Sequence, residues 1–581
     1  MASSSAAHPP LSTSADPLRE DPGRVETATV EADVRFEQAD SRKRSNATSS
    51  TSALPAARGE RIPGPPIVET KEEMQEELHN LDRVKMALEG GARLSSPEQS
   101  VLRLANIRLS GSSAVRPSFL ARVCRPYVDE DLAFSRLYRL LHSSSGRLDF
   151  PPPGAPTTLQ GVLQLTSSLA NDLQRLDLYN GIDASILPAI TPSSPQTAMQ
   201  DVDVLLQLRE SPRLFLKSST DVGNGEGSVS VQGRIRNLFG GAEKLEGSYE
   251  TGTRTRGAMN ATFTTPVLAS PDHAFTLSGY LSNRDKTFYA SHYEALQGLK
   301  ASLTANASSS SQHELAWELS WRQMNRLSPY ASASIRKMAR GGGHSVKSSL
   351  VHTFVSDTRD AVTPSQGGSE GRLFKSVTEM AGLGGDAQFV KWEGQWGINR
   401  SLENKLGSGW AWAAGARAGL MRPLTLPSIA SGETSSPMTA ADVKLPFADR
   451  FQLGGPTCVR MFKMNSLGPK DGRDSLGGTA FYSLGASLFS PLPLKPHWPL
   501  KMHAFFNGGQ LSSLPLSLSA AKPADLLQDT LLRPSTSAGV GLMYEQGALR
   551  LELNAGMPLS AARGDGSRKG VQLGVGISFL G

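Results

Sequence analysis

Apolar and polar residues alternate with a period of two in segment after segment, from about residue 211 to the end of the chain. Clear cases lie within 314–322, 388–399 and 571–580. A period of two places all apolar side chains on one face of a β-strand. The segments are about ten residues long, which is the length that a tilted strand needs to cross a bilayer. The pattern therefore predicts a β-sheet with one continuous apolar face.

The number and length of these segments predict that the sheet closes into a barrel. We count about sixteen runs, and an even count is usual for membrane barrels. They lie near residues 211, 227, 243, 257, 272, 293, 312, 344, 372, 388, 409, 478, 498, 536, 547 and 570. An open sheet cannot lie in hydrocarbon, because its edge groups would be unpaired. We therefore predict a mainly β fold, with a transmembrane antiparallel β-barrel over residues 213–581. A soluble, adhesin-like β protein is the alternative, although its polar face usually points outward.

Composition excludes several other classes of protein. The 60 Lys and Arg residues nearly balance 54 Asp and Glu residues, and no long basic tract is present, so we expect no nucleic-acid partner. Two cysteines without metal-ligand spacing indicate neither a disulfide framework nor a metal site. The sequence has no HExxH, GxSxG or Walker pattern. We therefore expect no enzymatic activity and no cofactor.

The chain before residue 101 divides into two parts. Residues 1–65 are rich in Ser, Ala, Thr and Pro, a composition that predicts a disordered tail. Residues 66–100 contain the charged stretch ETKEEMQEELHNLDRVKMALE, which Gly90 and Gly91 follow. This pattern is typical of a solvated spacer helix.

Residues 101–212 form a separate predicted module. The periodicity indicates the order strand–helix–helix–strand–strand. The expected elements are a strand at 101–111, helices around 115–123 and 158–178, and strands near 181–190 and 201–209. By itself, this order fits any small α/β domain.

The stretch 451–489, which leads from the eleventh to the twelfth predicted strand, carries Arg460. Val459, Met461 and Phe462 surround this arginine in the sequence. A loop this long with defined turn chemistry is rarely passive. A guanidinium can donate several hydrogen bonds in a fixed geometry, although a solvated loop arginine is the alternative.

Four motifs of this stretch carry a family resemblance: LGGP, VRMF, LGPKDG and LGGTA. They resemble the central barrel subunits of the mitochondrial sorting and assembly machinery, within the superfamily of outer-membrane β-barrel insertases, also called the bacterial surface antigen family. The family usually has Val-Arg-Gly-Phe where this chain has VRMF, so Met461 occupies a glycine position. The resemblance also identifies the 101–212 module as similar to a polypeptide-transport-associated (POTRA) module.

The resemblance implies that the Arg460 loop folds into the lumen and is held there by the barrel wall. The expected wall strand lies near residue 498, where Phe505, Asn507 and Gly509 share the polar face. We expect Asn507 and main-chain carbonyls to accept hydrogen bonds from Arg460.

The seam between the first and last strands is the second expected site. The last strand has glycines, which weaken strand pairing, and an opened seam would present unpaired backbone groups to an added strand. The alternative is a static barrel with two ordinary closing strands. Four residues of the last strand also fit the sorting signal of mitochondrial barrel precursors: Gln572, Gly574, Ile577 and Phe579.

The function that the resemblance implies is folding and insertion of β-barrel precursors into the mitochondrial outer membrane. The implied partners are unfolded precursors, peripheral accessory subunits and membrane lipid, with the N-terminal module facing the intermembrane space. The alternative is a passive polypeptide or solute channel of the same superfamily, for example in a plastid envelope.

Overall fold

The computed structural model describes fourteen stretches of the chain. They are residues 102–128, 157–189, 200–223, 226–308, 310–340, 343–359, 370–424, 445–456, 458–493, 495, 498, 500–514, 533–546 and 549–576. The predicted tail at 1–65 and the predicted spacer helix at 66–100 lie outside the described residues, as do Ile577 and Phe579.

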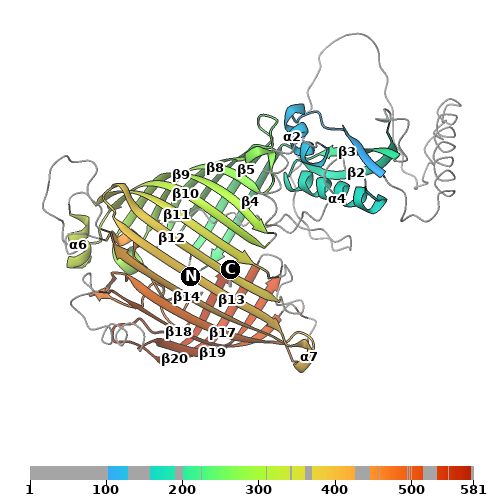
Figure 1. Ribbon diagram of the computed structural model, residues 1–581. Coiled ribbons are helices and arrows are strands. Elements are labelled where there is room, and N and C mark those ends of the chain that lie inside the picture. Colours follow the sequence, from blue (N-terminus) through green and yellow to red (C-terminus); the bar gives the residue numbers. More distant parts are fainter. Residues whose placement is uncertain are drawn as a thin grey trace, which may run out of the picture. The chain divides into compact units, whose positions relative to one another are not determined.

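The first folded part that the structure describes contains a three-stranded sheet and two helices (Figure 1). Strand β1 (Leu102–Ser110) pairs in parallel with the central strand β3 (Gln200–Glu210), and β2 (Tyr179–Pro188) pairs antiparallel to β3. Helices α2 (Pro117–Val128) and α4 (Leu159–Arg175) come between β1 and β2 in the chain. The order of these elements is the predicted one.

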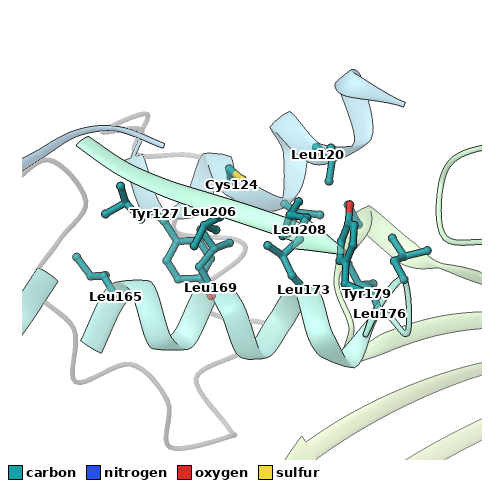
Figure 2. Close-up of a cluster of buried hydrophobic side chains, with 14 of the residues drawn as sticks. Leu120, Cys124, Tyr127, Leu165, Leu169, Leu173, Leu176, Tyr179, Leu206 and Leu208 are labelled. Carbon is teal, nitrogen blue, oxygen red and sulfur yellow. The ribbon is translucent and has the colours of Figure 1, made fainter. Parts of the chain in front are cut away.

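The core of this module forms because one face of α4 is apolar. Thr158 caps the helix by accepting a hydrogen bond from the Gly161 N–H, and leucines recur along one side. Leu169 and Leu173 are fully buried and point toward β3, which carries Leu206 and Leu208 (Figure 2). Burial of each such leucine stabilises the module by roughly 1.5–3 kcal/mol.

Sixteen strands of the described chain form one antiparallel sheet in sequence order. They are β4 (Leu214–Gly223), β5 (Glu226–Arg236), β6 (Lys244–Gly252), β7 (Thr255–Pro266), β8 (His273–Asp285), β9 (Tyr293–Ser308), β10 (Ser311–Asn325), β11 (His344–Asp357), β12 (Gly371–Gly385), β13 (Phe389–Ser401), β14 (Ala411–Pro423), β17 (Ala480–Pro491), β18 (Leu500–Ser512), β19 (Ser535–Gln546), β20 (Leu549–Ser560) and β21 (Gly570–Gly576). The first strand, β4, contacts the last, β21, so the sheet curls into a barrel (Figure 1). The predicted fold class is confirmed.

The connections between strands contain short helices. They are η2 (Val267–Ala269), α5 (Thr287–Ala290), α6 (Ala333–Ala339) and α7 (Glu403–Leu406). No helix in the described stretches is both long enough and apolar enough to span a membrane.

The two faces of the barrel wall differ sharply in polarity. On β10, Trp317 is 43% exposed on the outer face, whereas the neighbouring Glu318 is 3% exposed on the inner face. The same alternation places Lys347 of β11 and Glu379 of β12 inside, where Lys347 Nζ lies 2.6 Å from the Glu379 carboxylate. A soluble protein buries its apolar face. The apolar exterior and charged interior are those of a barrel surrounded by lipid.

The long connection between β14 and β17 folds into the barrel. It contains the 3-10 turn η4 (Phe447–Asp449) and a small hairpin of β15 (Lys470–Asp471) and β16 (Asp474–Ser475). Its apolar side chains are buried against strand residues of the wall. This cluster comprises Phe451, Leu453, Val459, Phe462 and Leu467 of the loop with Phe389, Met421, Phe481 and Leu511 of the strands.

Candidate functional site in the lumen and at the seam

Arg460 lies inside the barrel, against the wall formed by β18 and β20. Its Nε and Nη2 atoms donate to the carboxylate of Glu552 at 3.3 and 3.2 Å, and Nη1 donates to Asn507 Oδ1 at 3.4 Å. The guanidinium carbon lies 5.2 Å from the centre of the Phe505 ring. Arg460 is 7% exposed and Glu552 is fully buried, so water does not screen this ion pair as it would at a surface.

The sequence identified only part of this set of partners. Phe505 and Asn507 are brought to Arg460 as expected. The hydrogen bonds of the guanidinium within the described chain go to Glu552 and Asn507, so side chains take the place of the expected main-chain carbonyls. Glu552 was missed. Its only signal in the sequence is its place on the polar face of the β20 strand.

Glu552 belongs to a buried polar network on the last wall strands. Asn554 Nδ2 donates to the Glu552 carboxylate at 3.1 Å, and Asn554 Oδ1 lies 2.8 Å from His503 Nε2. All three side chains are almost completely buried. Neighbouring hydrogen bonds polarise one another in such surroundings, so the Arg460 contact is part of a connected array.

Met461 forms the tip of the loop in a left-handed backbone conformation, with φ of 64°. Glycine adopts this conformation without steric cost, which explains why the related motif has glycine at this position. The Met461 N–H donates to Gln572 Oε1 at 3.0 Å, and Gln572 Nε2 donates to the Phe462 carbonyl at 3.4 Å. The Arg568 N–H donates to the Met461 carbonyl at 2.9 Å. Gln572 of the last strand therefore holds the loop tip.

Gly509 lies where the loop presses on the wall. A Cβ at this position would come within 3.1 Å of both Val459 and Leu453 side-chain carbons. Val459 and Phe462 are fully buried in the loop cluster. The structure thus brings Gly509 to the VRMF segment, together with Phe505 and Asn507 from the same strand.

Asp449, which precedes the VRMF segment, is a second, separate anchor that sequence reasoning missed. The Asp449 carboxylate accepts from Arg322 Nη1 of β10 at 2.5 Å, and the Asp449 carbonyl accepts from Lys391 Nζ of β13 at 3.0 Å. Lys347 Nζ of β11 lies 3.9 Å from the same carboxylate. The loop is therefore attached to β10, β11 and β13 at Asp449 and to β18–β21 at its tip.

The seam differs from the rest of the barrel wall. β4 pairs along its length with β5, and β21 pairs with β20. β4 and β21 are in contact, but no ladder of backbone hydrogen bonds joins them among the residues that the structure describes. Gly574 lies directly opposite Glu552 in the β20–β21 ladder.

Within the described ranges, no three His, Cys, Asp or Glu side chains gather in an arrangement that could hold a metal ion. Cys124 and Cys458 are both free thiols, the first in the module core and the second in the lumen loop.

A sixteen-stranded sheet that curls into a barrel, with an internal loop fixed by arginine, defines a particular class of membrane barrel. The chain belongs to the Omp85 superfamily, whose domain matches residues 237–579. It is 33% identical over 486 residues to the SAM50-like protein of Schizosaccharomyces pombe, covering 82% of this chain and 90% of that protein. It is 30% identical over 427 residues to the sorting and assembly machinery component 50 homolog of Homo sapiens, covering 72% and 83%.

A solved structure supports the fold independently. BamA from Haemophilus ducreyi lacking POTRA domains 1–3 superposes with a TM-score of 0.60 at 15% identity, covering 82% of this chain and 84% of that chain. The resemblance to the sorting and assembly machinery barrel, first indicated by the loop motifs, is confirmed by these comparisons.

Proposed function

We propose that this chain is the core barrel of a mitochondrial sorting and assembly machinery, and that it folds and inserts β-barrel precursors through the seam between β4 and β21. The observation that carries the proposal is the seam itself. Fifteen neighbouring strand pairs are joined by ladders in the described chain, whereas β4 and β21 are only in contact. The names of the relatives in fungi and animals support the same function.

The chemistry of the proposed function is an exchange of backbone hydrogen bonds. An unpaired strand edge is a ready template for another strand. Each hydrogen bond that a precursor makes with the edge replaces one with water, for a net gain of about 0.5–1.5 kcal/mol. Pairing therefore proceeds downhill strand by strand, and the protein acts without a nucleotide, metal or catalytic residue.

The proposed partners follow from this arrangement. Precursors arrive from the intermembrane space, where the N-terminal module lies, and their final strands pair at the seam. Peripheral accessory subunits bind outside the lipid-facing band. A passive channel of the same superfamily is less well supported, because the loop cluster around Phe451 and Phe462 fills part of the lumen with buried side chains.

Reconstitution into liposomes tests the proposal. Full-length protein should accelerate the assembly of an urea-unfolded mitochondrial barrel precursor, measured as protease-resistant, heat-modifiable product. Liposomes containing heat-denatured protein serve as the control. Pore conductance in planar bilayers without any acceleration of assembly would contradict the insertase function and favour the channel.

A further inference from the structure

The two strands that border the seam are held by different parts of the molecule. β21 is held from inside the lumen, because Gln572 binds the tip of the Arg460 loop. None of the loop contacts described above reaches β4. This first strand instead follows the N-terminal module directly, since β3 ends at Glu210 and β4 begins at Leu214.

The three residues between β3 and β4 are tied at both ends. The Ser211 N–H donates to the Leu178 carbonyl of the module at 2.8 Å. Arg213 Nη2 donates to the Asn237 carbonyl at 2.8 Å, and the Arg213 carbonyl accepts from the Arg236 N–H at 2.7 Å. A linker this short and this well bonded transmits any displacement of the module to the beginning of β4.

The turn at 237–243, between β5 and β6, forms a socket for the module. The buried carboxylate of Glu243 accepts from the N–H groups of Phe239 and Gly241, at 3.2 and 2.8 Å, inside the turn itself. The same carboxylate accepts from Arg116 Nη2 of the module at 2.8 Å. The Arg116 N–H donates to the Gly240 carbonyl at 2.8 Å. Glu243 thus shapes the turn and binds the module at once.

The shape of the socket depends on close backbone approach. A Cβ at Gly240 would lie 2.9 Å from Arg116 Cγ and 3.2 Å from Arg116 N, and the φ of Gly240 is 86°. Asn237 Nδ2 donates to the Ala114 carbonyl at 2.8 Å, and its Oδ1 accepts from Ala242 N–H at 3.2 Å. Asn237 therefore fixes the turn and the module in the same way as Glu243.

Two residues at and just after the end of α4 form further ionic contacts with the barrel. Asp177, which follows α4, lies 3.2 Å from Arg236 of β5 and 3.1 Å from Lys244 of β6. Arg175 of α4 forms an ion pair with Asp272, which precedes β8. The module is consequently fixed at two separated points on the same rim of the barrel.

We propose that the 237–243 turn is a docking socket that sets the position of β4, and that Arg116 and Glu243 are positioning residues for the seam. Weakening the socket lets the module and β4 move together away from β21, which the lumen loop keeps in place. The consequence for precursor insertion rests on the proposed function, but the coupling between socket and seam width does not.

Pulsed electron paramagnetic resonance between two spin labels measures the seam directly. The labels are placed through Leu216→Cys on β4 and Leu573→Cys on β21, in a full-length chain carrying Cys124→Ala and Cys458→Ser. Both leucines are highly exposed on the outer face, at 72% and 63%, so the labels should not disturb packing. Glu243→Gln should add a population with longer label separation. Arg116→Gln removes the same ion pair and leaves the turn hydrogen bonds of Glu243 in place, so it should add the same population.

A matched control is Glu393→Gln, which breaks the 2.5 Å pair with Arg417 on β13 and β14, away from the seam in strand order. It should leave the label separation unchanged. Asn237→Ala removes the hydrogen bond to the Ala114 carbonyl without changing the charge, and it should lengthen the label separation as Glu243→Gln does. It replaces Glu243→Gln in the experiment if that variant fails to fold. An unchanged distance distribution in folded Asn237→Ala or Glu243→Gln protein would overturn the proposal.

The label separation is measured without any precursor. If the wild-type protein does not accelerate assembly in liposomes, the proposed function is wrong, but the effect of the socket on the label separation is unaffected. If assembly is normal and the socket variants do not change the label separation across the seam, only the coupling between socket and seam is contradicted.

Discussion

The guanidinium of Arg460 lies 3.2 Å from the carboxylate of Glu552, although 92 residues separate the two in the sequence. Glu552 is on β20, the neighbour of the last strand, and Gly574 of the last strand lies directly opposite it. The loop between β14 and β17 therefore reaches the last two strands, and its tip lies near the seam. Its arginine joins two parts of the barrel wall that the sheet connects only through several intervening strands.

Arg460→Ala should free the loop tip and leave the buried carboxylate of Glu552 without this guanidinium. Breaking a buried ion pair from one side costs about 3–5 kcal/mol, so the loop should leave its site while the strands stay paired. We expect the loop to become protease-sensitive and precursor assembly to fall, with insertion of the protein itself partly retained. Lys463→Ala, an exposed loop residue, is the control. If the loop of Arg460→Ala stays protected and assembly is normal, the arginine has no holding role.

Met461 offers a test of backbone strain at the loop tip. Its φ of 64° costs a residue with a Cβ about 1–2 kcal/mol, a cost that glycine avoids. Its side chain is also fully buried, so removing it creates a loss of packing. Met461→Gly should be tolerated and should leave the loop better protected than Met461→Ala, since both lose the side chain and only alanine keeps the strain. If the loop of Met461→Ala is protected from protease as well as or better than that of Met461→Gly, residue 461 does not keep its left-handed backbone conformation in the variants.

Gly509→Ala should push the loop away from β18. The added Cβ would meet Val459 and Leu453 at 3.1 Å and the Tyr482 carbonyl at 3.0 Å. Overpacking of this kind costs about 1–3 kcal/mol. We expect slower precursor assembly and faster proteolysis of the loop. Gly247→Ala on β6, where a Cβ would meet nothing within 4 Å, should behave like the wild type; equal effects of the two variants would argue against a specific contact.

Gly574→Leu tests the dual role expected for the last strand. Directly opposed residues of antiparallel strands share a face, so the larger side chain would be directed toward Glu552 and its ion pair. Labelled precursor carrying this substitution should import into isolated mitochondria but remain unassembled and protease-sensitive on native gels. We expect a similar delay for Phe579→Ala. Normal assembly kinetics for both variants would leave the strand as an ordinary closing strand.

Cys124 gives a prediction for the N-terminal module alone. Burial in the module core raises the pKa of its thiol from 9.0 to about 12. The folded module should therefore not react with maleimide at neutral pH, and reaction should appear only on unfolding. Above pH 9 the unfolded chain ionises this thiol and the folded module does not, so stability is lost as pH rises toward 12. The Cys124→Ala module should show a shallower loss over this range, and rapid labelling of native protein would contradict the burial.

The strands could be read from the sequence because their information is local. Leu315 and Trp317 alternate with Glu314 and Glu318 within a single strand. This pattern arises because one face of the strand contacts lipid and the other faces a polar lumen. All sixteen predicted runs correspond to strands. The loop motif also carried enough information to place Arg460 in the lumen beside Asn507 and Phe505.

The partners of the site residues required the tertiary structure, because strand periodicity tells which face a side chain lies on but not what it meets across the lumen. Glu552 and Asp449 are ordinary acidic residues in the sequence, and the glycine-marked turn before Glu243 does not show what its carboxylate binds. Barrel curvature brings Glu552 to Arg460, the path of the loop brings Asp449 to Arg322, and docking of the module brings Glu243 to Arg116. The sequence by itself determined the strands, their faces and the family. The ion pairs that hold the loop and the module were decided only by closure of the sheet, which places residues distant in the chain within hydrogen-bonding distance.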